Sequence, residues 1–334
     1  MSRAGLIAGA AVWIVACGSS TTTATSDAGT TTDASIADAG SLADGAVDAP
    51  SADVHSGVDA PPDVDAPASD VAASDTLTGD ASTATWWRPP VSTTFFWELA
   101  NAPPDNSKNV GAYDVDGFGN DAAEVAALHA LGLKVVCYMD AGTYEPGRPD
   151  SSSFPAALKG SGVSGWPGEL WLDVRPSGPS YAALQAIMIA RFKICQSKGF
   201  DAVEPDNIDS YQNSPGFPTT AGDQLAYDEW IATTVHSLGM AVFQKNDLDQ
   251  IGTLLPYFDG LLNEECNKFS ECDKVAPYVT AAKPVWNAEY QDDGESTASF
   301  CPADVTAGIV GALFSLNLDG TVFSPCSNDV GKIN

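Results

Sequence analysis

Acidic side chains follow several short apolar runs of this sequence. Glu204-Pro205-Asp206-Asn207 comes after one such run and Asn263-Glu264-Glu265 after another. Two carboxyl groups on either side of a glycosidic bond can hydrolyse it, because one protonates the leaving oxygen while the other acts as nucleophile or base. These residue types therefore indicate paired-carboxylate chemistry.

Aromatic and further polar residues accompany the acidic groups. Sugar rings stack on aromatic faces, although core packing is the alternative role for each aromatic residue here. The aromatic candidates are Trp97, Tyr138, Trp166, Tyr211, Trp286 and Tyr290.

The sequence does not contain the motifs that serine-nucleophile or zinc-dependent catalysis would require. No serine stands in a G-x-S-x-G turn, and His129 and His236 fall inside helical stretches, away from the strand ends. His55 lies in a linker, and there is no C-x-x-C pair for a zinc site. We expect neither a metal nor a cofactor.

The elements that must position the acidic groups alternate as strand and helix. The pattern predicts strands at residues 94–99, 110–115, 134–139, 202–205, 241–244, 260–263, 284–288 and 309–316. It predicts helices at residues 122–131, 181–198, 224–238 and 248–257. Eight strands in about 250 residues match a (β/α)8 TIM barrel. An open doubly wound sheet is the alternative, but no glycine-rich phosphate turn follows the first strand.

The barrel also explains where the polar clusters fall. Catalytic residues of a TIM barrel come from the C-terminal ends of several strands. Seven of the predicted strands run into a polar or acidic cluster at that end, at Trp97-Glu98, Asp114 and Asp116, Tyr138 and Asp140, Glu204–Asn207, Gln244–Asn246, Asn263–Glu265 and Glu289-Tyr290. A cap or turn accounts for one such cluster but poorly for seven.

The N-terminal part has a different composition. Residues 1–17 join a basic residue, a short apolar run and small residues before Cys17, as a lipoprotein signal does; an ordinary signal peptide cut near Ala16 is the alternative. Residues 18–85 hold twelve Asp and no Lys, Arg or Glu, so we predict a disordered acidic linker. The catalytic domain then spans residues 86–334. We expect an exported envelope or surface protein that meets the membrane only through its lipid.

The formal charge is −29. An acidic domain does not suit nucleic acid, whose phosphates need a basic face. The charge fits either plain solubility or attraction of a cationic substrate. We expect a monomer.

Six cysteines follow Cys17, an even number that suggests disulfides in an exported domain. Cys266 and Cys272 are close enough to staple a short loop, and Cys301 with Cys326 would hold the C-terminal region. Cys137 either pairs with Cys195 or stays a buried thiol.

Several runs together resemble glycoside hydrolase family 114. They are residues 199–209 (GFDAVEPDNID), Cys137-Tyr138 with residues 141–145 (AGTYE), residues 168–173 (GELWLD), Gln244-Lys245-Asn246 and residues 263–266 (NEEC). The resemblance covers nearly all of residues 86–326 in order. The family is typified by TIM-barrel endo-α-1,4-polygalactosaminidases, so the resemblance implies hydrolysis of α-1,4-linked galactosamine polymers by a retaining mechanism.

The resemblance also assigns the catalytic pair. The family's two proposed catalytic acids match Asp206, as nucleophile, and Glu264, as general acid/base. Glu204 is the rival to Asp206, because residues two apart in a strand project to the same side. Lys245 would keep Asp206 charged, whereas Glu264 needs a raised pKa. Glu98 departs from the family, which often has Gln there.

A partly deacetylated amino-sugar polymer would be cationic, so acidic residues of the cleft would bind its ammonium groups. The predicted substrate-binding residues are Trp97, Asp114, Asp116, Tyr138, Asp140, Glu204, Asn207, Asp209, Tyr211, Lys245, Asn246, Glu289 and Tyr290. A non-catalytic polysaccharide-binding lipoprotein on the same barrel is the alternative function. A structural envelope protein would need no carboxyl pair.

Overall fold

The computed structural model describes residues 86–326. The predicted signal peptide, the lipidation site Cys17 and the linker 18–85 lie outside the described residues. No helix in the described part is long and apolar enough to cross a membrane.

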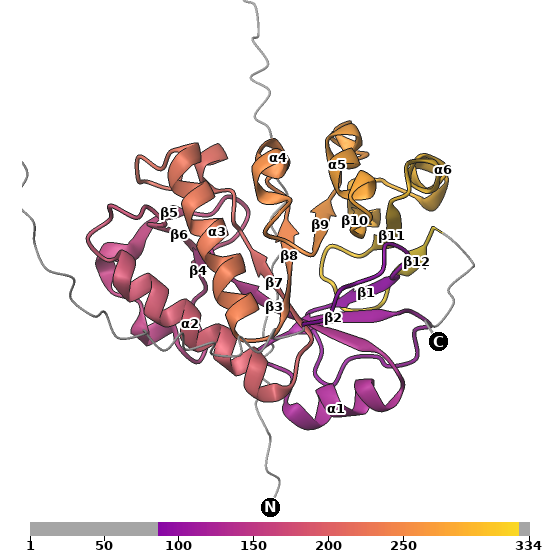
Figure 1. The fold of residues 1–334 in the computed structure, drawn as a ribbon, viewed down its shortest axis with the longest axis horizontal. Coiled ribbons are helices and arrows are strands. Elements are labelled where there is room, and N and C mark those ends of the chain that lie inside the picture. Colours follow the sequence, from indigo (N-terminus) through magenta and orange to yellow (C-terminus); the bar gives the residue numbers. More distant parts are fainter. Residues whose placement is uncertain (1–85, 327–334) are drawn as a thin grey trace, which may run out of the picture. The chain divides into compact units, whose positions relative to one another are not determined.

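Eight parallel strands form the barrel, in the order in which they occur along the chain (Figure 1). They are β1 (Phe95–Glu98), β2 (Ala112–Asp116), β3 (Lys134–Asp140), β7 (Ala202–Asp206), β8 (Ala241–Lys245), β9 (Gly260–Glu264), β10 (Val285–Tyr290) and β11 (Val310–Phe314). A short β12 (Phe323–Pro325) pairs antiparallel with β11. The TIM-barrel prediction is confirmed, and each predicted strand overlaps one of the eight.

The helices lie outside the strands. They are α1 (Ala122–Ala130), α2 (Tyr181–Lys198), α3 (Ala221–Ser237), α4 (Ile251–Leu254), α5 (Ala276–Thr280) and α6 (Thr297–Ala307). Asp121 starts α1 with a capping box, which satisfies backbone N–H groups of the first turn. Gly199 ends α2 in the left-handed conformation. The predicted helix 248–257 is shortened at both ends, because residues 248–250 form a 3-10 turn and α4 ends at Leu254. Neither α5 nor α6 is among the predicted helices.

A small sheet interrupts the barrel between β3 and α2. Its strands are β4 (Thr143–Tyr144), β5 (Lys159–Gly162) and β6 (Leu170–Leu172), in the order β4-β6-β5. These strands are not among the predicted ones, because strands of two to four residues carry almost no period-2 signal.

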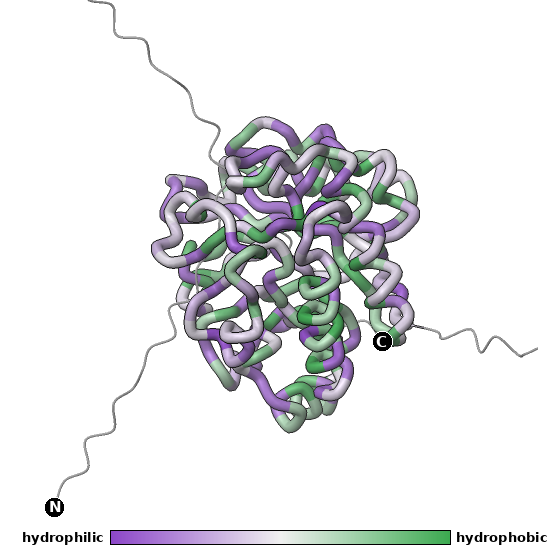
Figure 2. The backbone as a smooth tube through the Cα atoms, turned by 90° about the vertical axis from the view of Figure 1, so that its left-hand side faces the viewer, coloured by the Kyte–Doolittle hydropathy of each residue, from purple (hydrophilic) through white to green (hydrophobic). Residues whose placement is uncertain are grey.

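Stacked aromatic rings fill part of the barrel interior. The ring of Trp286 lies between Phe95, at 4.9 Å, and Phe243, at 4.2 Å between ring centroids. Trp286 is therefore a core residue. Hydrophilic and hydrophobic stretches are interspersed along the backbone (Figure 2), and Val91, Leu131 and Val305 are the large hydrophobic residues that the described part exposes.

Three disulfides join the six cysteines of the described region. Cys137 pairs with Cys195, Cys266 with Cys272, and Cys301 with Cys326. The two predicted pairs are confirmed. Cys137, for which a buried thiol was the alternative, forms a disulfide with Cys195. Cys137 on β3 is thereby tied to α2.

An N-terminal cluster, defined by Trp86, Arg88, His236 and Asp259, holds the start of the domain against the barrel. Asp259 accepts hydrogen bonds from the Trp86 indole at 3.1 Å and from Arg88, and its carboxylate lies 2.8 Å from the His236 ring. Trp86 stacks on His236 with 4.0 Å between centroids. His236 is thus a structural residue, and His129 likewise pairs with Asp201.

Candidate active site

Lys245 lies at the centre of the predicted site. It is the last residue of β8, its side chain is 1% exposed, and its ammonium Nζ contacts three carboxylates. The Nζ atom lies 3.0 Å from Glu204 Oε1, 2.8 Å from Asp206 Oδ1 and 3.1 Å from Glu264 Oε2. The ring of Trp97 closes the remaining side, 4.6 Å from Nζ. One cation therefore joins both predicted catalytic residues.

Asp206 ends β7 and accepts hydrogen bonds on both oxygens. Its Oδ1 receives Lys245 and the backbone N–H of Asn207 at 2.8 Å, and its Oδ2 receives the Tyr138 hydroxyl at 2.8 Å. Donors directed at both oxygens hold a carboxylate anion in a fixed orientation, as a nucleophile requires. Burial raises the pKa of Tyr138 well above its ordinary value, and the charge of Asp206 adds to this, so the phenol stays a donor.

Glu264 ends β9 and has a different environment. The Tyr290 hydroxyl donates to its Oε1, the Asn246 amide donates to Oε2 at 3.4 Å, and its own N–H donates to Asn246 Oδ1 at 2.9 Å. Burial raises the pKa of Glu264, and the charge of Asp206 raises it further, although Lys245 and Tyr290 oppose the change. A raised pKa is the change that a general acid requires.

Left-handed residues follow the catalytic strands and aim their side chains back at the site. Asn207 has φ 61° after β7 and Asn246 has φ 45° after β8. Asparagine tolerates this region better than most residues. The turn after β3 packs against the first of them, since a Cβ on Gly142 would lie 1.6 Å from the Asn207 carbonyl oxygen. Only glycine fits there, so the sequence of this turn fixes the loop that follows Asp206.

Asp140, Glu145 and Glu169 form a second acidic group beside Asp206. Asp140 accepts bonds from the Thr143 N–H at 2.7 Å and from the Asn207 amide at 3.0 Å. Burial raises the pKa of Asp140 to about 8, with Glu145 as the next cause. Burial likewise raises the pKa of Glu169 to about 9, and the charge of Asp140 adds to this.

Arg148 balances this acidic group. Its guanidinium bonds Asp116 and lies 2.7 Å from Glu145 Oε1. Asp116 is a predicted site residue, whereas Glu145, Arg148 and Glu169 have no predicted role. Glu145 and Glu169 lie in runs that carry the family resemblance, which was the one available signal, while Arg148 had none.

Asp114 and Glu204 lie deeper than the predicted catalytic pair. Both are fully buried, at 0% exposure, whereas Asp206 and Glu264 keep 4% and 6%. Glu204 reaches the site only through Lys245. The alternation of side chains along β7 placed Glu204 and Asp206 on one side, as expected, but at different depths.

The remaining predicted residues are spread around this centre. Tyr211 lies at the rim, where its hydroxyl bonds Asp247 at 2.8 Å, and Asp209 is buried beside it with 6% exposure. Glu289 faces away from the barrel interior, because it alternates with Tyr290, and accepts a bond from the Asn267 N–H at 2.8 Å. Trp97 and Tyr290 are fully buried and Tyr138 is 3% exposed, so little aromatic face meets a ligand.

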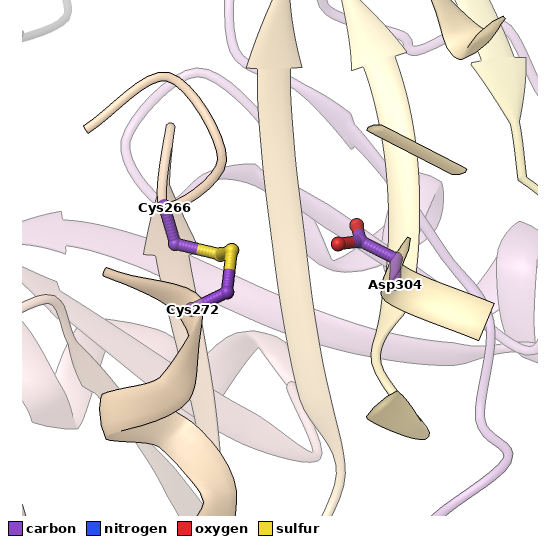
Figure 3. A group of neighbouring side chains, drawn as sticks. All are labelled: Cys266, Cys272 and Asp304. Carbon is purple, nitrogen blue, oxygen red and sulfur yellow. A yellow bond between two sulfur atoms is a disulfide. The ribbon is translucent and has the colours of Figure 1, made fainter. Parts of the chain in front are cut away.

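Among the described residues, one group of three potential metal ligands comes together, Cys266, Cys272 and Asp304 (Figure 3). Both cysteines are joined in a disulfide and offer no thiolate to a metal. Asp304 instead accepts bonds from the amides of Asn267 and Asn287, at 2.7 and 3.0 Å. The group is therefore structural.

An apolar cavity of about 360 Å³ lies at the opposite end of the barrel. It is lined by the N-terminal ends of β1 and β11, among them Thr94, Phe95, Val310 and Gly311. A binding site usually adds a few convergent polar groups to its apolar lining. This cavity has no carboxyl group, and the chemistry remains at the C-terminal ends of the strands.

An eight-stranded parallel barrel whose strand ends bring two carboxyl groups to one lysine has the architecture of a glycoside hydrolase. The model of glycoside-hydrolase family GH114 matches residues 76–330, and the chain belongs to this family. The resemblance found in the sequence is confirmed.

Solved structures agree with this assignment. The chain is similar to Aspergillus fumigatus Ega3, solved in complex with galactosamine, with 31% identity and a TM-score of 0.67 over 72% of this chain and 98% of that one. The glycoside hydrolase domain of PelA from Pseudomonas aeruginosa has 14% identity and a TM-score of 0.53, over 70% and 98% of the two chains, and shares the fold. No curated protein sequence matches the chain.

Proposed function

We propose that the protein hydrolyses α-1,4-linked galactosamine-containing polysaccharide, acting within the polymer and retaining the anomeric configuration. The observation that carries the proposal is the contact of one buried ammonium with both Asp206 and Glu264. The substrate class follows from the similarity to Ega3, whose structure holds galactosamine.

The mechanism uses two displacements. The Asp206 carboxylate attacks the anomeric carbon while Glu264 protonates the departing glycosidic oxygen, which breaks that bond and forms a glycosyl ester on Asp206. Glu264, now ionised, removes a proton from water, and this water attacks the anomeric carbon and releases Asp206. The second inversion restores the original configuration.

The spacing of the two carboxyl groups supports retention. Asp206 Oδ1 and Glu264 Oε2 both contact Lys245 Nζ, at 2.8 and 3.1 Å. The two oxygens are therefore at most about 6 Å apart, the sum of those distances, below the roughly 6.5–9.5 Å of inverting enzymes.

The acidic group beside Asp206 is the proposed recognition site for a cationic sugar. Thr143 bridges Asp140 and Glu169, and Arg148 bridges Asp116 and Glu145. An ammonium group of the polymer would favour their ionised forms and bind to them. Asn207, Asp209, Tyr211 and Asn246 are proposed contacts at the rim.

The test is the pair of isosteric variants Asp206→Asn and Glu264→Gln, assayed separately on galactosamine polymers of graded acetylation. We expect each to lose activity by about 10³-fold or more. Asp249→Asn is the matched control, since Asp249 is 59% exposed and pairs with Lys274. Near-normal turnover in either catalytic variant would remove that residue from the mechanism. Binding without fragments in the wild type would favour the non-catalytic alternative.

Two product measurements address the finer claims. Mass spectrometry of early products should show oligomers of several lengths, as internal cleavage requires. Nuclear magnetic resonance of the newly released sugar should show the α-anomer first, since retention preserves the configuration of the bond. Early release of monomer alone contradicts endo action, and the β-anomer contradicts retention.

We also propose export and lipid attachment at Cys17, on the basis of the N-terminal sequence. Labelled palmitate fed to expressing cells should enter the wild-type protein and not the Cys17→Ser variant. Equal labelling of the two proteins would contradict lipidation at this residue.

A further inference from the structure

The parallel pairing of β8 with β9 becomes irregular beside Glu264. Asn246, the residue after β8, donates its backbone N–H to the Leu262 carbonyl oxygen at 3.0 Å. In a regular parallel ladder the next bond would run from the Glu264 N–H to the backbone carbonyl of Asn246. The side chain of Asn246 takes that place instead, because its Oδ1 accepts the Glu264 N–H at 2.9 Å. A side-chain amide therefore completes the ladder at the proposed general acid/base.

The backbone carbonyl of Asn246 is held by a different donor. Asn246 and Asp247 both have left-handed φ angles, 45° and 47°. The amide of Gln244, which is fully buried, donates to the backbone carbonyl oxygens of both residues, at 2.8 and 3.0 Å. The Tyr278 hydroxyl on α5 donates to Gln244 Oε1 at 2.8 Å, so this amide is held at both ends. The turn leaves the Glu264 N–H to a side-chain acceptor.

The partners of the Asn246 amide determine its orientation. A backbone N–H can only donate, so the atom that faces the Glu264 N–H is the amide oxygen. The amide nitrogen then donates to Glu264 Oε2, at 3.4 Å. Asn263 donates from its Nδ2 to the same Asn246 oxygen at 3.1 Å. Two donors directed at this oxygen hold the amide in one of its two possible orientations.

The side chain of Asn263 uses its donor and leaves its acceptor without a partner. Asn263 is 1% exposed, and within the described residues its Oδ1 accepts no hydrogen bond. A buried polar atom without a partner costs free energy. The packing of β9 does not explain this cost, whereas the bond from Nδ2 to Asn246 gives the amide a role.

We propose that Asn263 is a positioning residue, which locks the Asn246 amide and through it holds Glu264 in place. This inference rests on the proposed function, because Glu264 is the group that protonates the leaving oxygen in that mechanism. Asn263 acts only through Asn246.

A locked amide affects both the position and the proton of Glu264. The groups that face Glu264 are Lys245 on β8, Asp206 on β7 and Tyr290 on β10. Burial raises the pKa of Glu264, Lys245 and Tyr290 oppose the change, and the charge of Asp206 adds to it. The Asn246 donor acts in the same direction as Lys245 and Tyr290, since a donor favours the ionised form. Release of the amide should therefore let Glu264 move and hold its proton more tightly.

Asn263→Leu removes the donor and keeps most of the side-chain volume. We expect kcat to fall about tenfold to a hundredfold while KM stays within about threefold, because substrate still binds but the acid is misplaced. The matched control is Asn120→Leu. Asn120 is also 1% exposed, donates to one backbone carbonyl oxygen at 3.0 Å and has an Oδ1 without a donor.

The control should keep kcat within about threefold of the wild type. An equal loss of kcat in Asn120→Leu and Asn263→Leu overturns the proposal, because removal of any buried amide would then have the same effect. If Asn263→Leu does not fold, as judged by circular dichroism, Asn263→Ala replaces it with the same expectations.

A double-mutant cycle measures whether Asn263 acts through Asn246. In the Asn246→Ala background, Asn263→Leu should change kcat by less than about twofold, because the amide that Asn263 holds is gone. The same loss of kcat in both backgrounds overturns the proposal.

Carbon-13 nuclear magnetic resonance of labelled glutamate reads Glu264 without turnover, with Glu264→Gln to assign its carboxyl resonance. The pKa of Glu264 should be higher in Asn263→Leu and in Asn246→Ala than in the wild type, because each change weakens or removes the donor to Oε2. The basic limb of the rate profile should move to higher pH in both variants. An unchanged titration of Glu264 in Asn263→Leu overturns the proposal. Failure of the proposed hydrolysis leaves this titration unaffected, so the two failures are distinguishable.

Discussion

Replacing Lys245 by methionine removes the one cation that joins the catalytic pair and keeps most of the side-chain volume. The ammonium contacts three carboxylates at 2.8–3.1 Å and is 1% exposed. At an effective dielectric constant of about 20, each contact is worth about 5 kcal/mol of attraction, most of which offsets desolvation. We therefore expect a loss of about 3–5 kcal/mol in the free energy of unfolding.

The effect on catalysis is separate from the effect on stability. Removing a preorganised charge from an active site lowers kcat by about 10²–10³-fold. Lys245 holds down the pKa values of Glu204 and Glu264, so its removal raises them and places protons near Asp206. The basic limb of the kcat profile, which follows the ionisation of Glu264, should therefore move to higher pH.

Initial rates on galactosamine oligomers across pH, with urea unfolding at neutral pH, measure both effects. The control is Lys274→Met, because Lys274 is 41% exposed and pairs with Asp249 and Glu271 outside the site. An unchanged kcat and profile in Lys245→Met would refute the electrostatic role. A raised KM with unchanged kcat would instead mean that Lys245 binds substrate.

Three further changes test single contacts. Tyr290→Phe removes a donor that lowers the pKa of Glu264, so the basic limb of the rate profile should move to higher pH and kcat should fall about tenfold. Gly142→Ala places a Cβ against the Asn207 carbonyl oxygen, and kcat/KM should fall about 10²-fold while circular dichroism shows a folded barrel. Asp259→Asn should lower the free energy of unfolding by about 2 kcal/mol at pH 7, measured by urea titration.

The loss of unfolding free energy caused by Asp259→Asn depends on pH in a definite direction. Burial opposes ionisation of Asp259, but the bonds from His236 and Trp86 prevail and hold its pKa below the ordinary value. A depressed pKa contributes stability above the unfolded value of about 4, and that stability is lost as the pH falls below it. The difference between wild type and Asp259→Asn should therefore narrow in acid. A constant difference would contradict the ion pairs.

The barrel was predictable from the sequence because the strands are buried and seven of the eight predicted strands end in polar residues. Two apolar runs, 202–205 and 260–263, gave the catalytic strands within one residue of β7 and β9. The short strands of the inserted sheet left no such pattern. The ion pair between Asp116 and Arg148, which lies in that insertion, was therefore not predictable.

Depth within the barrel was the main feature that the sequence could not reveal. Alternation assigns Asp114 and Asp116 to the same side of β2, but one is fully buried and the other bonds Arg148 near the rim. The same rule separates Glu289 from Tyr290, and applying it to β10 would have placed only Tyr290 inside. Depth depends on the tilt and stagger of the closed barrel, which no single strand encodes.

In the proposed function, negative charge at the site has two opposing effects, which Lys245 reconciles. Negative charge recognises the ammonium groups, but each added carboxylate makes every neighbour harder to ionise, and a nucleophile must be ionised. Burial already raises the pKa of Asp140 to about 8 beside the site. Lys245, the Asn207 N–H and the Tyr138 hydroxyl all donate to Asp206, an arrangement that suits an anion. Burial raises the pKa of Glu264, although Lys245 and Tyr290 oppose the change. The lysine therefore lets recognition by charge coexist with a carboxyl pair in unequal protonation states.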